Sequence, residues 1–141
     1  MKKVIKTCVL LFLLCGLIST TILAGNSNFS KYGIQNSSYT WLSTGSTNTK
    51  ATPGADWFIH VGALSFGGGN ISNTLGMAHN PLLNGSEQGV TFWTKTTTSQ
   101  AVYNKWINGG TASKTYTLGV RLDSLIYPTT YASTSGYWNA N

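Results

Sequence analysis

Alternation of apolar and polar residues is the main pattern in the chain beyond Ala24. The segment 115–122 has it most clearly, because every second residue is large and apolar: Tyr116, Leu118, Val120 and Leu122. Successive side chains of a β-strand point to opposite faces. The pattern therefore predicts a strand whose apolar residues face a core, with Thr117, Gly119 and Arg121 facing out.

Other segments carry the aromatic and β-branched residues, and the turn residues at their ends, that are typical of strands. They are 38–43, 57–65, 70–78, 89–97, 103–107 and 131–138. No window has apolar residues at helical spacing. The sequence therefore predicts an all-β fold, a single antiparallel β-sandwich of six or seven short strands.

Local features predict how these strands face and where they end. In 57–65 the alternation divides the side chains between two faces, one with Trp57, Ile59, Val61 and Ala63, the other with Phe58, His60, Gly62 and Leu64. The three glycines at 67–69 predict a hairpin or a wide turn. Asn108-Gly109-Gly110 predicts a further turn, because these residues accept positive φ. The Ser, Thr, Gly and Lys residues of 44–55 predict a loop.

The segment 1–24 differs in kind from the rest of the chain. Lysines at positions 2, 3 and 6 precede an apolar stretch at 8–18, and Ala24 is a small residue at the end of the segment. These are the three parts of a secretory signal peptide. A membrane-spanning helix needs about 20 apolar residues, so a retained anchor fits less well. We expect a signal helix at 1–24, cleavage near Ala24, and a secreted domain at 25–141 with no stable transmembrane anchor.

Removal of this segment changes the charge and redox character of the protein. Cys8 and Cys15 both lie in it, so the secreted domain has no disulfide and no thiolate metal site. Six basic and three acidic residues remain, which gives a net charge of +3 with the charges spread singly. A nucleic-acid-binding protein would have clustered Lys and Arg, so we expect no nucleic-acid partner. Nothing in the sequence indicates a metal or another cofactor.

Titratable residues are few, and their spacing predicts no catalytic site. Asp56 and His60 would share one face of a strand, but four residues of strand separate them by about 13 Å. Ordinary glycoside hydrolysis needs two carboxylates beside the scissile bond, and the sequence does not bring Glu87 near Asp123. We expect a protein that is not an enzyme. A secreted hydrolase that brings together at least two of these four residues is the alternative.

Aromatic side chains are the candidate ligand-binding groups. Trp and Tyr either pack in a core or stack on sugar rings from an exposed β face. Trp93 lies on the opposite side of its segment from Val90 and Phe92, so one of these two faces can be exposed. Tyr137 and Trp138, near the end of the chain, are the other candidates. Core packing is the alternative for each of the three.

Two segments form a pattern that continues to the end of the chain. An alternating strand from Tyr116 to Leu122 is followed by a loop rich in Asn, Tyr, Ser and Thr, and then by Ser135-Gly136-Tyr137-Trp138. In this pattern the chain resembles an uncharacterised family of small, exported, cysteine-free proteins of Gram-positive bacteria. In class and composition it is also similar to the lactococcin-type β-sandwich bacteriocins. Neither resemblance supplies site residues.

Two functions are predicted from these observations. The first is a secreted, non-enzymatic factor that acts at or binds the bacterial cell envelope, either bacteriocin-like or surface-associated. The export signal, the aromatic β pattern and the slight positive charge favour it. The second is a carbohydrate-binding module that uses exposed Trp or Tyr side chains. The expected partner is therefore a cell-envelope component or a glycan.

Overall fold

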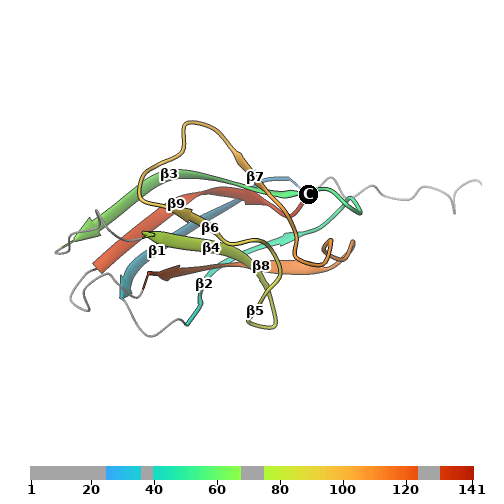
Figure 1. Ribbon diagram of the computed structural model, residues 1–141, viewed down its shortest axis with the longest axis horizontal. Helices are drawn as coiled ribbons and strands as arrows, with labels where there is room; N and C mark the ends of the chain where they lie inside the picture. The colour runs from blue at the N-terminus through green and yellow to red at the C-terminus, as the bar shows by residue number, and fades with distance from the viewer. Residues whose placement is uncertain (1–24, 36–39, 68–74, 124–130) are drawn as a thin grey trace, which may run out of the picture.

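The computed structural model describes residues 25–35, 40–67, 75–123 and 131–141. These residues form strands and no helix (Figure 1). The strands are β1 (Ser27–Gln35), β2 (Leu42–Thr49), β3 (Trp57–Gly67), β4 (Met77–Leu83), β5 (Ser86–Glu87), β6 (Phe92–Thr94), β7 (Val102–Asn104), β8 (Thr115–Leu122) and β9 (Tyr131–Asn139). The predicted signal segment, 1–24, lies outside the described residues.

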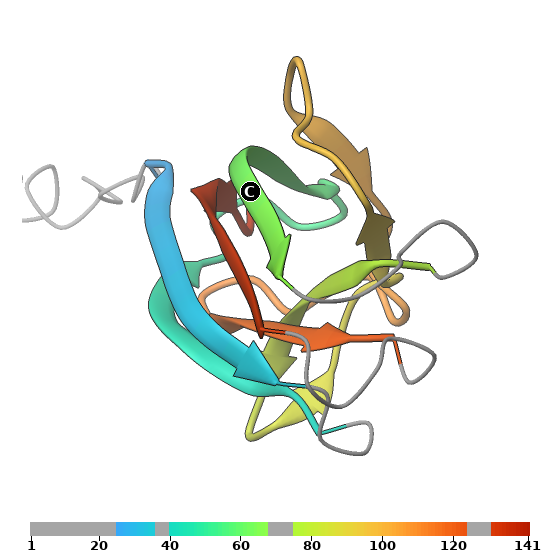
Figure 2. The same cartoon turned by 90° about the vertical axis from the view of Figure 1, so that its left-hand side faces the viewer.

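Two antiparallel sheets pack against each other, which confirms the predicted all-β sandwich (Figures 1 and 2). The first sheet has the order β1-β9-β3-β7, and the second has the order β2-β8-β4-β5 with β6 also pairing with β4. Among the described strands, β4 and β5 are the only consecutive pair that share hydrogen bonds. The strand that comes last in the sequence, β9, lies between β1 and β3.

Strand β8 has the predicted bounds and the predicted faces. Its four alternating apolar side chains are all buried: Tyr116, Leu118, Val120 and Leu122. The predicted strands at 57–65 and 131–138 are also confirmed, as β3 and β9. Gly109 and Gly110 have φ of 75° and 62°, as the predicted turn requires. In contrast, β3 and β4 belong to different sheets, so the three glycines do not form a hairpin. The alternative, a wide turn, falls on residues 68–74, which lie outside the described residues.

A β-bulge in β3 reverses the predicted faces of two residues. Val61 pairs with β9 and Ala63 pairs with the next residue of that strand, so Gly62 is an extra residue in the ladder. Beyond the bulge Ala63 is exposed and Leu64 packs against the core. The alternation predicted from the sequence therefore holds only as far as Val61.

The predicted loop at 44–55 is wrong over its first half, because residues up to Thr49 form β2. This strand pairs only with β8, and its side chains are nearly all polar. An edge strand needs few apolar residues, since it buries only part of one face. Strand β1 was not predicted for the same reason: Phe29 and Ile34 are its only buried residues.

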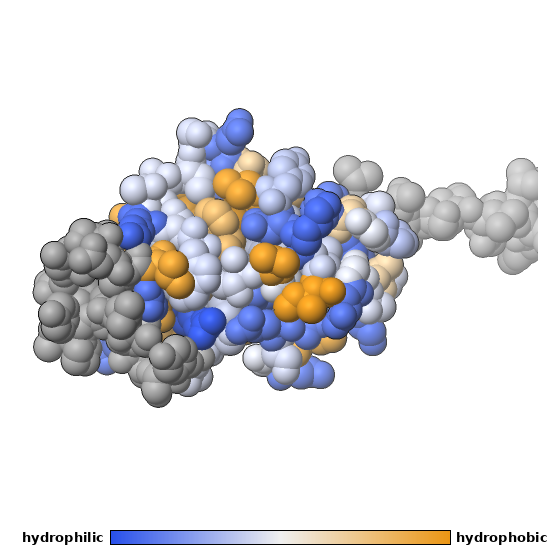
Figure 3. All heavy atoms as spheres, viewed as in Figure 1, coloured by the Kyte–Doolittle hydropathy of each residue, from blue (hydrophilic) through white to orange (hydrophobic). Residues whose placement is uncertain are grey.

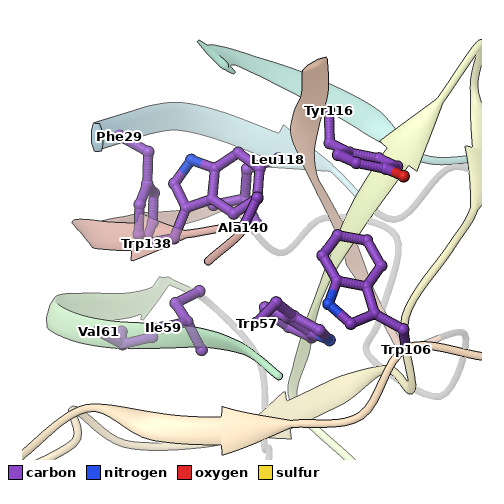
Figure 4. Close-up of a cluster of buried hydrophobic side chains, with 9 residues drawn as sticks. All are labelled: Phe29, Trp57, Ile59, Val61, Trp106, Tyr116, Leu118, Trp138 and Ala140. Carbon is purple, nitrogen blue, oxygen red and sulfur yellow. The ribbon is translucent and has the colours of Figure 1, made fainter. Parts of the chain in front are cut away.

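Three tryptophans form the centre of the main core cluster (Figure 4). The buried members of this cluster are Phe29, Trp57, Ile59, Val61, Trp106, Tyr116, Leu118, Trp138 and Ala140. Each buried indole N–H also has an acceptor. Trp57 donates to the carbonyl of Lys105 at 3.2 Å, Trp106 to that of Ala55 at 3.0 Å, and Trp138 to the hydroxyl of Ser46 at 3.0 Å. The last bond crosses from the first sheet to the second.

Hydrogen bonds also join the two sheets at both sides of the sandwich. Along one side, where β1 and β2 run side by side (Figure 2), the Asn48 amide donates to the Ser27 hydroxyl at 3.0 Å. Along the other side, Val90 N donates to Lys105 O at 2.8 Å and Ile107 N donates to Gln88 O at 2.9 Å. The sheets therefore cannot slide past each other without breaking these bonds.

Lys50 is wholly buried beside the aromatic core. Its ammonium group donates to the carbonyl of Ala55 at 2.5 Å and to that of Asn141 at 3.1 Å, and it lies 4.9 Å from the centre of the Trp106 ring. Burial lowers the pKa of Lys50, and attraction to Asp56 acts in the opposite direction. This one cation thus links the segment after β2 to the end of the chain.

His79 is a buried polar group between the two sheets. Its Nε2 atom lies 3.1 Å from the hydroxyl of Thr134, and its ring packs between Phe29 and Phe92. Burial lowers the pKa of His79 to about 3. The imidazole is therefore neutral in the folded protein at any pH well above that value.

We predict that folding stability falls in acid because of His79. Below pH about 6.5 the unfolded chain protonates this histidine and the folded protein does not, so the free energy of unfolding falls by about 1.4 kcal/mol per pH unit. This amounts to a loss of about 2 kcal/mol between pH 6.5 and pH 5. Urea unfolding at several pH values measures it. His79→Gln should flatten the pH dependence of the free energy of unfolding, and the control His60→Gln should not. Equal slopes in the unmodified protein and in both variants would contradict the prediction.

We also predict that Gly136 tolerates no side chain. A Cβ atom at this position would collide with the carbonyl oxygen of His60 and lie 3.1 Å from the backbone nitrogen of Gly62. Gly136→Ala should therefore lower the free energy of unfolding by about 3 kcal/mol. The matched control is Gly62→Ala in the same bulge, where the nearest atom would be 3.8 Å away. Urea unfolding should give the control a stability within about 0.5 kcal/mol of the unmodified protein.

Candidate functional site

The structure separates the three residues predicted to bind ligand. Trp138 is wholly buried, as the core-packing alternative describes, and its ring does not lie on an exposed face. It faces inward from an inner strand of the first sheet and packs against Phe29. Tyr137, its neighbour in β9, is half-buried on the outer face of that sheet. Trp93 is half-buried on the outer face of the second sheet.

Arg121 lies against two indole rings on the outer face of the second sheet. Its guanidinium carbon is 4.7 Å from the centre of the Trp41 ring and 5.5 Å from the centre of the Trp93 ring. A guanidinium group near an aromatic ring is attracted by the electrons of the ring face. The sequence analysis named Trp93 as a candidate ligand-binding residue, but not Trp41. The contacts of Arg121 with both rings bring together three segments that are far apart in the sequence.

Strand register and one missing side chain produce this arrangement. Ala78 of β4 pairs with Arg121 on one side and with Trp93 on the other, so all three share a face. Trp41 reaches the same face because Gly119 leaves room for it. A Cβ atom at Gly119 would collide with Leu82 and lie 3.3 Å from the Trp41 ring.

Glu87 connects Trp41 to Arg121. Its Oε1 atom accepts a hydrogen bond from Trp41 Nε1 at 2.7 Å and lies 3.8 Å from Arg121 Nη2. Its Oε2 atom accepts a hydrogen bond from the hydroxyl of Thr91 at 3.4 Å. No described residue accepts a hydrogen bond from the guanidinium group, whose Nε atom is buried without a partner. We refer to Trp41, Glu87, Trp93 and Arg121 as the tryptophan–arginine cluster.

Asn80 holds the segment between Glu87 and Trp93 in place. Its buried side-chain amide donates to the carbonyl of Gly89 at 2.6 Å and accepts from the nitrogen of the same residue at 3.1 Å. It also accepts from the nitrogen of Gln88 at 3.2 Å. These bonds replace strand pairing between β5 and β6, so the positions of Glu87 and Trp93 are fixed relative to β4.

The outer face of the first sheet carries a second group of aromatic side chains. The Phe58 and Tyr103 rings have centres 5.2 Å apart, and the His60 and Tyr137 rings have centres 4.8 Å apart. His60 Nδ1 also lies 3.1 Å from the hydroxyl of Thr98. Tyr137 thus belongs to a different surface from Trp93, on the opposite sheet.

The structure does not bring the acidic residues together as a hydrolase would require. Asp56 pairs with Lys105 at 2.7 Å, and Asp123 accepts a hydrogen bond from the nitrogen of Leu75 at 2.5 Å. Glu87 and Asp123 lie beside opposite ends of β4, about 16 Å apart along the strand. Three or more histidine, cysteine or acidic side chains positioned for a metal ion do not occur among the described residues.

Hydrophobic residues on the face drawn in Figure 3 form small separate groups among hydrophilic ones. The described residues include no helix long and apolar enough to span a bilayer. Comparison of the chain with protein-family models, with curated proteins and with solved structures gives no match. The resemblances stated above therefore remain predictions.

We predict that Arg121 stabilises the fold through its two ring contacts. Arg121→Met should lower the free energy of unfolding by about 1–2 kcal/mol, since a partly desolvated cation–π contact is lost from both indoles. The matched control is Lys105→Met, whose side chain is 77% exposed and whose ion pair should contribute less than about 1 kcal/mol. Urea unfolding measures the loss in free energy of unfolding for each variant. Equal losses in Arg121→Met and Lys105→Met would count against the prediction.

Proposed function

We propose that this protein is exported and binds a glycan of the bacterial cell envelope through the tryptophan–arginine cluster, without catalysing a reaction. One observation supports the proposal most. Trp41 and Trp93 both contact Arg121 on an outer face, whereas the other three tryptophans are buried. Core packing accounts for the buried three, but not for a pair of indoles fixed on the surface.

The chemistry of the cluster suits a sugar ring. A pyranose has apolar C–H faces, which pack on indole rings, and hydroxyl edges, which both donate and accept hydrogen bonds. Arg121 is a donor that no described residue satisfies, and Glu87 is an acceptor, with 3.8 Å between their nearest atoms. Neighbouring hydroxyls of one ring can therefore meet a donor and an acceptor side by side. Such a combination of stacking and a few fixed polar groups is typical of ligand sites.

Two features of the sequence favour export to the envelope. The segment 1–24 has the pattern of a signal peptide, and the remaining chain has a net charge of +3. A weakly basic protein is attracted to the anionic envelope before it contacts a specific glycan. Growth inhibition of related bacteria, which the likeness to lactococcin-type bacteriocins implies, would be a separate consequence of binding.

We predict that Trp93→Ala weakens binding of the purified protein to peptidoglycan or to its soluble glycan strands about tenfold. The lost ring contact should contribute about 1.4 kcal/mol. The matched control is Tyr32→Ala, which removes a 75% exposed aromatic residue outside the cluster. Tryptophan fluorescence titration and co-sedimentation measure binding, and a thermal melt verifies folding.

Glu87→Gln tests the polar part of the cluster while keeping its shape. It should weaken binding as well, because a carboxylate accepts stronger hydrogen bonds from hydroxyls than an amide does. Undiminished affinity in both Trp93→Ala and Glu87→Gln would exclude the cluster as the site. Absence of binding by the unmodified protein to any envelope glycan would exclude the proposed function.

A further inference from the structure

We infer that the outer face of the first sheet is a second glycan-binding surface, so that one molecule can hold two glycan chains. The inference rests on the proposed function, and it adds a site that differs from the tryptophan–arginine cluster in position and composition. The surface follows β3 and is called the β3 row. It consists of Asp56, Phe58, His60, Tyr103, Lys105 and Tyr137.

Strand register places the rings of the β3 row in sequence. Phe58 pairs with Tyr103 of β7, and His60 pairs with Tyr137 of β9. Each ring therefore has a ring partner, at 5.2 Å in the first pair and 4.8 Å in the second. Tyr103 remains 64% exposed in spite of its contact. The pairs are thus fixed in position, and at least one ring is open to a ligand.

Polar groups lie at both ends of the row. Asp56 and Lys105 form an ion pair of 2.7 Å next to the Phe58 pair, with Lys105 largely exposed. At the other end, the hydroxyl of Thr98 lies 3.1 Å from His60 Nδ1 and fixes the ring. The Nε2 atom of His60 faces Gly62, which has no side chain to cover it. Hydrogen-bonding groups therefore flank the aromatic rings of the row.

This composition fits a linear glycan better than other ligands. From Asp56 to His60 the row extends about 13 Å along the strand, which is longer than a single sugar ring. The charges of Asp56 and Lys105 cancel, so the row has no excess positive charge to attract a polyanion or an anionic membrane. An ion pair within the row also opposes insertion into lipid. A chain of sugar rings, which needs no net charge on the surface for stacking and hydroxyl contacts, meets both its aromatic and its polar groups.

The two surfaces face in opposite directions, because they lie on the outer faces of two sheets that pack against each other (Figure 2). A glycan strand bound to one surface therefore leaves the other free for a second strand. Two sites on a rigid body convert binding into cross-linking, and they raise the apparent affinity for a surface that presents many strands.

Light scattering of the purified protein mixed with soluble, high-molecular-weight glycan strands from peptidoglycan tests the inference. The unmodified protein should cross-link the strands, with a maximum in scattering at an intermediate ratio of protein to glycan. Tyr103→Ala and Trp93→Ala should each reduce the maximal scattering about tenfold, because each weakens one of the two sites that cross-linking needs.

Calorimetry with short glycan fragments should show two strong sites per molecule in the unmodified protein. Each single variant should show one strong site and one site that is about tenfold weaker. Tyr32→Ala is the control and should behave as the unmodified protein.

The outcomes separate this inference from the proposed function. Full scattering and unchanged stoichiometry in Tyr103→Ala would overturn the second site and leave the first in place. Loss of all binding in Tyr103→Ala, with none lost in Trp93→Ala, would assign the single site to the β3 row and overturn both the cluster and the cross-linking. No binding by the unmodified protein would overturn both proposals. The double variant should bind glycan about tenfold more weakly at both sites while it keeps a cooperative thermal melt.

Discussion

The burial of Trp138 is the constraint on which the two-sheet arrangement depends. Its strand is an inner one of the first sheet, its ring fills the space next to Phe29, and its N–H reaches Ser46 in the second sheet. Both cysteines of the chain lie in the segment 1–24, so no disulfide can hold the remaining residues together. A small domain without disulfides depends on apolar burial. Here large rings supply it, and each buried indole also makes a hydrogen bond that fixes its orientation.

Parts of the fold that depend on local alternation could be predicted from the sequence. Strand β8 is the clearest case, since inward and outward residues alternate from Tyr116 to Leu122. Strands β1 and β2 could not be predicted in this way, because they are polar edge strands that bury few side chains. Their stability comes from pairing with β9 and β8, which lie far along the chain. The bulge at Gly62 depends on the same pairing, so no local pattern indicates it.

The candidate site, like the fold, could be predicted only where local alternation of residues determines it. The alternation of Trp93 with Phe92 predicts that the two rings lie on opposite faces, one of which can be exposed, and that reasoning is local. Trp41 joins the cluster only because β2 pairs with β8 and because Gly119 provides room, which are two facts of tertiary structure. Tyr137 and Trp138 were both predicted as candidates, although adjacent residues of one strand cannot share a face. Alternation alone would have allowed only one of them, and the buried ring proved to be the larger one.

The position of β9 in the first sheet has a consequence for the order in which the protein folds. A chain leaves the ribosome from its N-terminus, so β1 and β3 emerge before the strand that joins them exists. The first sheet therefore cannot close until residues 131–141 have left the ribosome, so β1 and β3 remain unjoined while the strands between them and β9 are made. Most strand pairs join distant segments, which slows folding further because each must first overcome the entropy of closing a long loop. A delay of this kind keeps the first sheet open until its inner strand β9 is made, so the export proposed above would begin with a chain that has not yet folded.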